Sequence, residues 1–226
     1  MAGSIAARNR VPSLDYALGD EAVVHTLPMP AWKRAVDIAG SLAGLIGASP
    51  FFLALALYVV LDSRGGPLFR QTRVGIGGRC FTCWKFRSMH RNADQMLEGL
   101  LAQNEASGPI FKMKDDPRRT RAGRFLRKTS LDELPQLWNV LRGDMSLVGP
   151  RPPTVPEVLR YDEHHLERLS VTPGLTGLWQ VTLRGRHDFG DMVELDVEYA
   201  NRRSLALDLR IILMTVPTVL FGRGSC

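Results

Sequence analysis

Two adjacent carboxylates, Asp132 and Glu133, have the surroundings that best suit chemistry in this sequence. Basic residues crowd both sides of the pair; they are Arg124, Arg127, Lys128, Arg142 and Arg151. A carboxylate kept ionised among cations can act as a nucleophile or bind a metal ion, and arginine binds phosphate through paired hydrogen bonds. The residue types around the dyad therefore indicate chemistry on an anionic ligand, with both carboxylate roles open.

The element that follows the dyad is predicted to be a short helix. Apolar residues at 134, 137, 138 and 141 form one helical stripe, and Gly143 supplies a stop signal. Pro135 prefers the first helical position, so the dyad lies on the approach to the helix, where the backbone dipole favours negative charge. A purely structural interpretation also fits, because Ser130 and Glu133 have the spacing of a capping box.

Composition points to anionic partners. The chain has 226 residues and a formal charge of +6, which suits phosphorylated ligands, lipid headgroups or nucleic acid. Its basic loops lack the interleaved aromatic residues of a nucleic-acid binder, so no nucleic acid is expected. Three cysteines do not make a disulfide framework.

An uncharged segment, residues 38–61, indicates membrane contact. At roughly 1.5 Å per residue, a helix of this length could cross a bilayer core of about 30 Å. However, Ser49 and Pro50 lie at its centre, where proline is expected to break or kink a helix. Basic residues flank both ends, which the positive-inside rule places in the cytoplasm. We therefore favour a re-entrant helix-break-helix hairpin over a straight span.

The remaining pattern predicts three regions: an N-terminal tail over residues 1–30, the membrane hairpin over 31–64 and a catalytic domain over 65–226. The fold class is α/β (α+β), a monotopic membrane protein with a small β-hairpin and surrounding amphipathic interfacial helices. We expect strands at 68–74 and 80–89, helices at 92–104, 157–169 and 205–221, and a turn followed by a strand at 172–181. A second basic loop, Arg184 to Arg186, could hold anionic groups.

Several long motifs in a fixed order resemble those of the bacterial polyprenyl-phosphate sugar-phosphate transferases, the monotopic phosphoglycosyl transferase family. The resemblance covers residues 33 to about 222, and the chain is similar to the compact catalytic unit of that family. The motifs are residues 33–37, 49–50, 84–89, 127–138, 143–152 and 173–177.

The resemblance implies transfer of a sugar 1-phosphate from a UDP-sugar to polyprenyl (undecaprenyl) phosphate, with release of UMP, as the first membrane step of exopolysaccharide or O-antigen assembly. It implies that Asp132 is the nucleophile and contacts Mg²⁺, and that Glu133 assists. Phosphate would be bound by Arg127, Arg151 and Arg186, together with Lys85.

The resemblance also implies a location at the cytoplasmic face of the bacterial inner membrane, in contact with its lipids. Galactose or glucose 1-phosphate donors are favoured, and a homodimer is possible. A membrane-bound phosphohydrolase, which would release sugar phosphate to water, is the main alternative.

Overall fold

The computed structural model describes residues 24–63, 65–183 and 188–220, with side chains described up to residue 217. Helices predominate, and the β structure is confined to two small sheets. In chain order the α-helices and strands are α2 (Ala31–Ser63), β1 (Leu68–Val74), β2 (Cys80–Phe86), α3 (Ala93–Leu100), α4 (Arg121–Lys128), α5 (Gln136–Arg142), β3 (Ser146–Val148), α6 (Val155–Val158), α7 (Glu163–Leu166), β4 (Gly174–Thr176), α8 (Leu178–Thr182), α9 (Phe189–Arg202) and α10 (Leu205–Leu220). Short 3₁₀ turns are η1 (Ile76–Gly78), η2 (Leu101–Gln103), η3 (Leu131–Glu133) and η4 (Glu167–Ser170).

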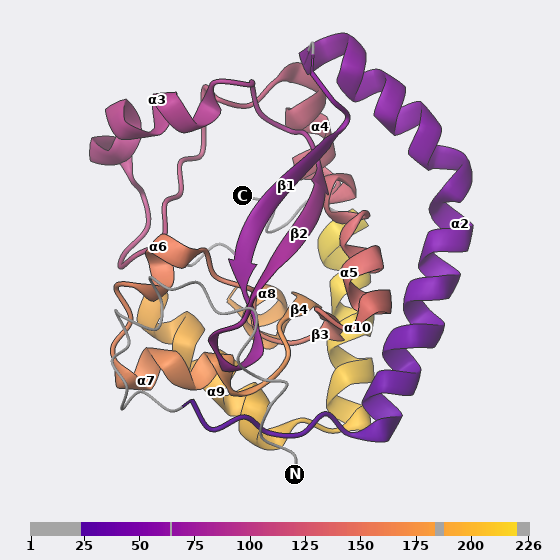
Figure 1. Ribbon diagram of the computed structural model, residues 1–226, viewed down its shortest axis with the longest axis vertical. Helices are drawn as coiled ribbons and strands as arrows, with labels where there is room; N and C mark the ends of the chain where they lie inside the picture. The colour runs from indigo at the N-terminus through magenta and orange to yellow at the C-terminus, as the bar shows by residue number, and fades with distance from the viewer. Residues whose placement is uncertain (1–23, 64, 184–187, 221–226) are drawn as a thin grey trace.

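The layout places the long helix α2 along one side of the molecule (Figure 1). The β1–β2 hairpin crosses the middle, and α3, α6 and α7 lie on the side opposite α2 (Figure 1). The hairpin is antiparallel, with Leu68 opposite Phe86 and Val74 opposite Cys80. This confirms a mixed fold with a small hairpin.

Helix α2 corrects the expected helix break. Residues 31–63 form one continuous helix with Pro50 inside it, and the helix curves along the side of the body (Figure 1). Proline has no N–H to donate to the carbonyl of residue i−4, here Ile46. The Ser49 hydroxyl lies 2.7 Å from that carbonyl oxygen and donates to it instead. The serine thus replaces the missing backbone bond, and the helix continues.

Both ends of α2 are attached to the body. Near its start, Lys33 is buried and donates hydrogen bonds to Val148 O, the Tyr199 hydroxyl and Asp208 Oδ2, the last at 2.6 Å. Near its end, Asp62 accepts from the backbone N–H of Ala122 at 2.7 Å. The body therefore lies on the same side of both ends.

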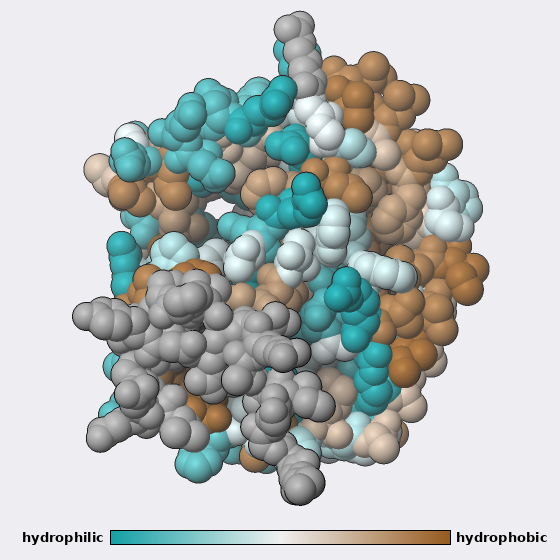
Figure 2. Space-filling view, viewed as in Figure 1, coloured by the Kyte–Doolittle hydropathy of each residue, from teal (hydrophilic) through white to brown (hydrophobic). Residues whose placement is uncertain are grey.

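The outer face of α2 is apolar and exposed. Leu53 is 79% exposed and Leu61 is 72% exposed, and Leu213 on α10 reaches 72%. Figure 2 shows the hydrophobic surface gathered over α2, whereas the surface over α3 is hydrophilic. Within the described part of the chain, α2 is the helix long and apolar enough to cross a membrane. An exposed apolar face of this size is typical of a surface that contacts lipid or another protein.

Residues 24–30, which fall within the expected tail, lie against the body. The backbone N–H of Leu27 donates to the carbonyl of Ser170 at 2.8 Å, and Arg203 donates to Pro28 O at 2.7 Å. The residues before 24 lie outside the described part.

Two expected elements are wrong. The single helix over 157–169 is divided into α6, α7 and η4, because Thr154 and Asp162 each start a new helix with a capping box. The expected strand reaching residue 181 ends at Thr176, and Leu178–Thr182 is helical. By contrast, β1 has the predicted bounds, and Gly143 ends α5 in the left-handed conformation with φ 91°.

Candidate active site

The dyad lies in η3, between α4 and α5, and does not form a capping box. Ser130 has a left-handed backbone with φ 54°, and its side chain makes no cap hydrogen bond. Helix α5 begins at Gln136, one residue later than expected, with Pro135 as its N-cap. The structural interpretation of the dyad is therefore wrong, and the side chain of Glu133 is directed to a different partner.

The two carboxylates differ in their surroundings. Asp132 is 5% exposed. Burial, and then the neighbouring Glu133 charge, raise the pKa of Asp132, while Lys85 and Arg127 oppose the rise. Glu133 is half-buried and pairs with Lys85, whose Nζ lies 2.6 Å from Glu133 Oε1. Burial alone would raise the pKa of Glu133, but Lys85, Arg151 and Arg73 together bring it below its ordinary value.

This arrangement separates the tasks of the pair. Glu133 is ionised and anchored by Lys85, while Asp132 makes no ion pair within the described chain and lines the cavity. A buried carboxylate whose charge is poorly solvated, but which has cations nearby, suits nucleophilic attack on an anionic substrate.

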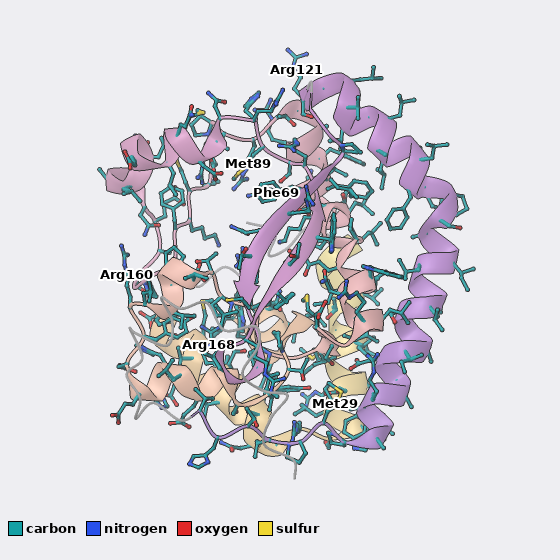
Figure 3. All side chains as sticks on the ribbon, in the orientation of Figure 1. Met29, Phe69, Met89, Arg121, Arg160 and Arg168 are labelled. Atoms are coloured by element: carbon teal, nitrogen blue, oxygen red, sulfur yellow. The ribbon has the colours of Figure 1, made fainter. Side chains whose placement is uncertain are left out.

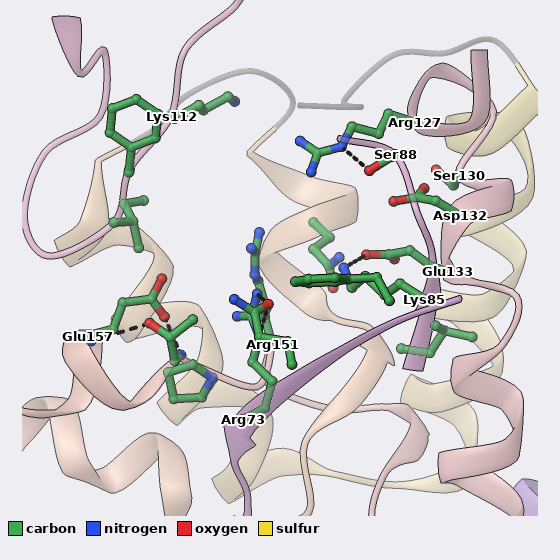
Figure 4. A pocket seen from close by; sticks show the side chains of 18 of the residues that line it. Arg73, Lys85, Ser88, Lys112, Arg127, Ser130, Asp132, Glu133, Arg151 and Glu157 are labelled. Atoms are coloured by element: carbon green, nitrogen blue, oxygen red, sulfur yellow. Dashed lines mark hydrogen bonds and ion pairs between the residues drawn. The ribbon is translucent and has the colours of Figure 1, made fainter. Parts of the chain in front are cut away.

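Guanidinium groups surround the dyad. The Nε of Arg127 donates to the hydroxyl of Ser88 at 2.9 Å, and Figure 4 shows the Arg127 guanidinium beside Asp132. Burial lowers the pKa of Arg127, and the charge of Arg119 adds to this effect.

Arg73 and Arg151 form the centre of the site. They lie next to each other, across from Glu133 and Lys85 (Figure 4). Arg73 is 7% exposed and donates to Pro152 O at 2.8 Å, which holds the loop that carries Arg151. Burial and the nearby Arg151 charge lower the pKa of Arg73. Neither arginine pairs with a carboxylate in the described part of the chain, so together they suit a multiply charged anion.

Close backbone packing sets the position of the Arg151 loop. Strands β3 and β4 are parallel, and the loop after β3 passes directly over Gly174. A Cβ on Gly174 would lie 2.0 Å from the Gly149 nitrogen, so a side chain cannot fit there. The loop that carries Arg151 is therefore held by its backbone contact with Gly174, which is distant from Arg151 in sequence.

The dyad, Lys85 and the surrounding arginines line one cavity of about 1470 Å³. Its lining spans the hairpin, α3, η3, α6 and the inner sides of α2 and α10. Phe69, Met89, Arg160 and Arg168 also line this cavity, and Figure 3 labels all four. Ligand pockets commonly measure about 300–1,000 Å³, so this cavity has room for a large ligand or for two.

The structure brings together most of the predicted site residues. Asp132, Glu133, Arg127, Arg151 and Lys85 all line the cavity. Arg186 lies outside the described residues. Sequence reasoning missed several polar residues that also line the cavity, among them Arg73, Ser88 and Arg119. For Arg73, a signal was available: a charged residue beside the apolar Val74, just before the glycine-rich turn.

A divalent cation fits this site only with help from a ligand. In the described part of the chain, no three His, Cys, Asp or Glu side chains are grouped to hold a metal ion. Mg²⁺ is, however, often held by one or two carboxylates together with substrate phosphates and water. Asp132, together with phosphate groups bound beside the nearby arginines, would provide such a donor set.

The fold and site thus define a protein with a buried carboxylate dyad in an arginine-lined cavity and an apolar helix along one side. The chain belongs to the bacterial sugar transferase family, whose profile matches residues 29–222.

Characterised relatives share most of this chain. The galactosyl transferase CpsE of Streptococcus agalactiae is 49% identical over 195 residues, covering 85% of this chain and 43% of the relative. The undecaprenyl-phosphate galactose phosphotransferase of Salmonella typhimurium is 46% identical over 198 residues, covering 85% of this chain and 41% of the relative. The exopolysaccharide production protein ExoY of Sinorhizobium fredii is 42% identical over 198 residues, covering 85% of this chain and 87% of the relative. The chain therefore spans less than half of the first two relatives and most of the third.

Proposed function

We propose that this protein transfers a sugar 1-phosphate from a UDP-sugar to polyprenyl phosphate, releasing UMP and starting the assembly of a polysaccharide. The observation that carries the proposal is the buried Asp132 carboxylate facing a cavity whose central arginines, Arg73 and Arg151, pair with no carboxylate among the described residues. The family membership and the names of the relatives support the same reaction. Two of those relatives are named for galactose, and galactose and glucose are the sugars that we favour.

In the first step, a carboxylate oxygen of Asp132 attacks the phosphorus that carries the sugar. The bond from this phosphorus to the bridging oxygen breaks, and UMP leaves with that oxygen. In the second step, a phosphate oxygen of the lipid attacks the same phosphorus and displaces Asp132. The product is a polyprenyl-diphosphate sugar, and the carboxylate is restored.

The surrounding residues have distinct tasks in this scheme. Arg151 and Arg127 neutralise the phosphates, which would otherwise repel the attacking carboxylate. Lys85 holds Glu133 in place, and Glu133 orients the groups around Asp132. Mg²⁺ bound by Asp132 and phosphate oxygens would stabilise negative charge on the diphosphate.

The position of α2 supports a monotopic arrangement at the cytoplasmic face of the inner membrane. Lys33 and Asp62 are both bound to the same body, so a straight crossing would require the body to follow the helix through the bilayer. A helix that enters one leaflet and has both ends at one surface avoids this cost. The lipid phosphate would then meet Asp132 at headgroup depth, and this proximity lowers the barrier.

The test uses the enzyme with UDP-galactose or UDP-glucose and no acceptor. We expect UMP release in an amount comparable to the enzyme, with a phosphosugar adduct on Asp132 detected by mass spectrometry. Asp132→Asn should abolish both, while the exposed control Asp115→Asn should retain both. Continuous release of sugar phosphate to water would instead identify a phosphohydrolase. Near-normal turnover by Asp132→Asn would refute the assignment of the nucleophile.

A further inference from the structure

The cavity extends well beyond the dyad, and its far wall has no role in the chemistry described so far. Figure 4 shows Lys112 and Glu157 on the wall opposite Asp132, with Arg151 and Arg73 between the two walls. Phe111 and Ile110 line the same end of the cavity. The site thus has an order: the reacting carboxylate, then the paired arginines, then a mixed apolar and acidic wall.

The segment that forms this wall is held in one conformation. The side chain of Asn104 donates to Ile110 O at 2.9 Å and accepts from the Lys112 N–H at 2.7 Å. The backbone of Glu105 also donates to Lys112 O at 2.8 Å. The guanidinium of Arg118 lies 4.8 Å from the centre of the Phe111 ring, covering part of it. Phe111 is therefore a positioned aromatic surface at the edge of the cavity.

Glu157 is held equally well. Its Oε2 accepts from the Thr154 N–H at 2.7 Å in the capping box of α6. A carboxylate can accept about four hydrogen bonds, so capping leaves acceptor capacity that faces the cavity. Two neighbouring hydroxyl groups could donate hydrogen bonds to these free acceptor positions of the Glu157 carboxylate.

The base of the wall is also rigid. Arg168 forms a buried ion pair with Asp196 at 2.6 Å and donates to the Tyr161 hydroxyl at 2.8 Å. Burial raises the pKa of Tyr161 to about 12, so its hydroxyl stays protonated in the cavity lining.

The chemistry of a UDP-sugar matches this order. Attack by Asp132 occurs at the phosphorus attached to the sugar, so the second phosphate lies one atom further on, and the nucleoside lies beyond it. If Asp132 is at the reacting phosphorus, the second phosphate falls near Arg73 and Arg151, and the nucleoside reaches the far wall.

The lipid acceptor does not suit this wall. Its tail has to remain in the bilayer, and the exposed apolar surface is on the side of α2 (Figure 2). The wall formed by residues 110–113 and α6 lies on the opposite side of the hairpin, near the hydrophilic surface over α3 (Figures 1 and 2). A water-soluble nucleoside is therefore the better occupant.

We propose that this far wall is the nucleoside subsite, in which Phe111 stacks on the uracil ring and Glu157 accepts hydrogen bonds from the ribose hydroxyls. The inference rests on the proposed function, because it uses Asp132 as the point of attack. It explains how the enzyme selects a ribonucleotide donor, and it assigns two residues that take no part in the reaction at phosphorus.

The test measures binding of UMP and of 2′,3′-dideoxy-UMP, which lacks both hydroxyls, by titration calorimetry. Because the ribose hydroxyls would donate hydrogen bonds to the charged Glu157 carboxylate, we expect the wild type to bind UMP about tenfold or more tightly than the dideoxy compound. In Glu157→Gln the amide oxygen can still cap α6, and the ratio should fall to about threefold or less. Glu157→Gln also removes a negative charge near the phosphate, which affects the binding of both ligands alike. The ratio of the two affinities therefore reports the hydroxyl contacts alone.

Phe111→Ala provides an independent arm. Loss of stacking should weaken binding of UMP and of the dideoxy compound alike, by about fivefold or more. The matched control is Phe125→Ala, an exposed aromatic on α4 that does not line the cavity, and it should bind both as wild type does. Thermal unfolding of each variant checks that it is folded.

The outcomes separate the two proposals. The subsite is refuted if wild type does not bind UMP, if Glu157→Gln keeps the full ratio, or if Phe111→Ala binds UMP normally. Because no chemical step is involved, the expected binding pattern without an Asp132 adduct would refute the proposed function and leave the nucleoside subsite standing.

Discussion

Replacing Lys85 with methionine should change the pH at which Asp132, the proposed nucleophile, becomes active. Lys85 forms the 2.6 Å ion pair with Glu133, and its charge also stabilises the ionised form of Asp132. Methionine has a similar length and no charge. The variant therefore leaves Glu133 without its nearest counter-ion, next to a buried aspartate that already ionises reluctantly.

The direction of the expected shift in the pH–rate profile follows because Asp132 must be ionised to attack in the proposed reaction. Burial and the Glu133 charge raise the pKa of Asp132, so the rate of the first step should fall as the pH drops through this raised value. Without Lys85, that pKa rises further, and the acid limb of the pH–rate profile moves to higher pH. An opposite charge at about 4–6 Å commonly shifts a carboxyl pKa by 1–3 units. Because the Lys85 and Glu133 side chains are 21% and 33% exposed, solvent screens part of this effect, and we expect a shift of about one unit.

The assay is single-turnover release of UMP as a function of pH, with donor at saturating concentration. Lys85→Arg keeps a positive charge and should restore much of the wild-type profile, while the exposed control Lys114→Met should match wild type. Because the Asp132 and Glu133 carboxyls interact, the acid limb of the profile reports an apparent pKa of the pair rather than of one residue. If Lys85→Met lowers the rate equally at every pH and leaves the limb in place, Lys85 acts on substrate binding and the electrostatic argument is wrong.

Three further outcomes can be measured directly. Lys33→Met leaves the Asp208 carboxylate buried without its partner and should lower the free energy of unfolding by about 3–5 kcal/mol; an unchanged denaturation midpoint would contradict this. In Gly123→Ala the new Cβ would meet the Ser88 carbonyl oxygen at 1.8 Å, so the variant should lose at least about 2 kcal/mol. Its control, Gly99→Ala, meets nothing within 4 Å in a helix and should be neutral or more stable. Removing divalent cations with EDTA should stop UMP release, and Mg²⁺ should restore it; full activity in EDTA would exclude the metal.

Sequence patterns within a few residues were enough to predict β1, the end of α5 and the position of the dyad. Alternating residues and a glycine-rich turn were enough to place β1, and Gly143 was enough to end α5, because a left-handed residue is needed there. The position of the dyad before α5 followed from Pro135, which cannot occupy the helix interior without losing a hydrogen bond.

Long-range contacts decided what the sequence pattern could not. Nothing near Lys33 in the sequence indicates that it meets Asp208, 175 residues away. The role of Arg73 depends on Pro152, which the fold brings beside it. Such residues are found only once the β3–β4 contact places the loop of Arg151 over the hairpin.

Helix α2 shows how one side chain can reverse a local rule. Read alone, Pro50 predicts a break, because it leaves the Ile46 carbonyl without a backbone donor on a helix whose apolar face is exposed. In a bilayer an unpaired carbonyl would cost several kcal/mol, so a broken helix would be unstable in that position. The Ser49 hydroxyl supplies the missing donor from within the helix, and the chain bends without exposing a polar group. The Ser49–Pro50 pair therefore acts as a bend that is compatible with lipid. In the proposed monotopic arrangement, this bend would keep both ends of α2 at one membrane surface, because the body binds both ends.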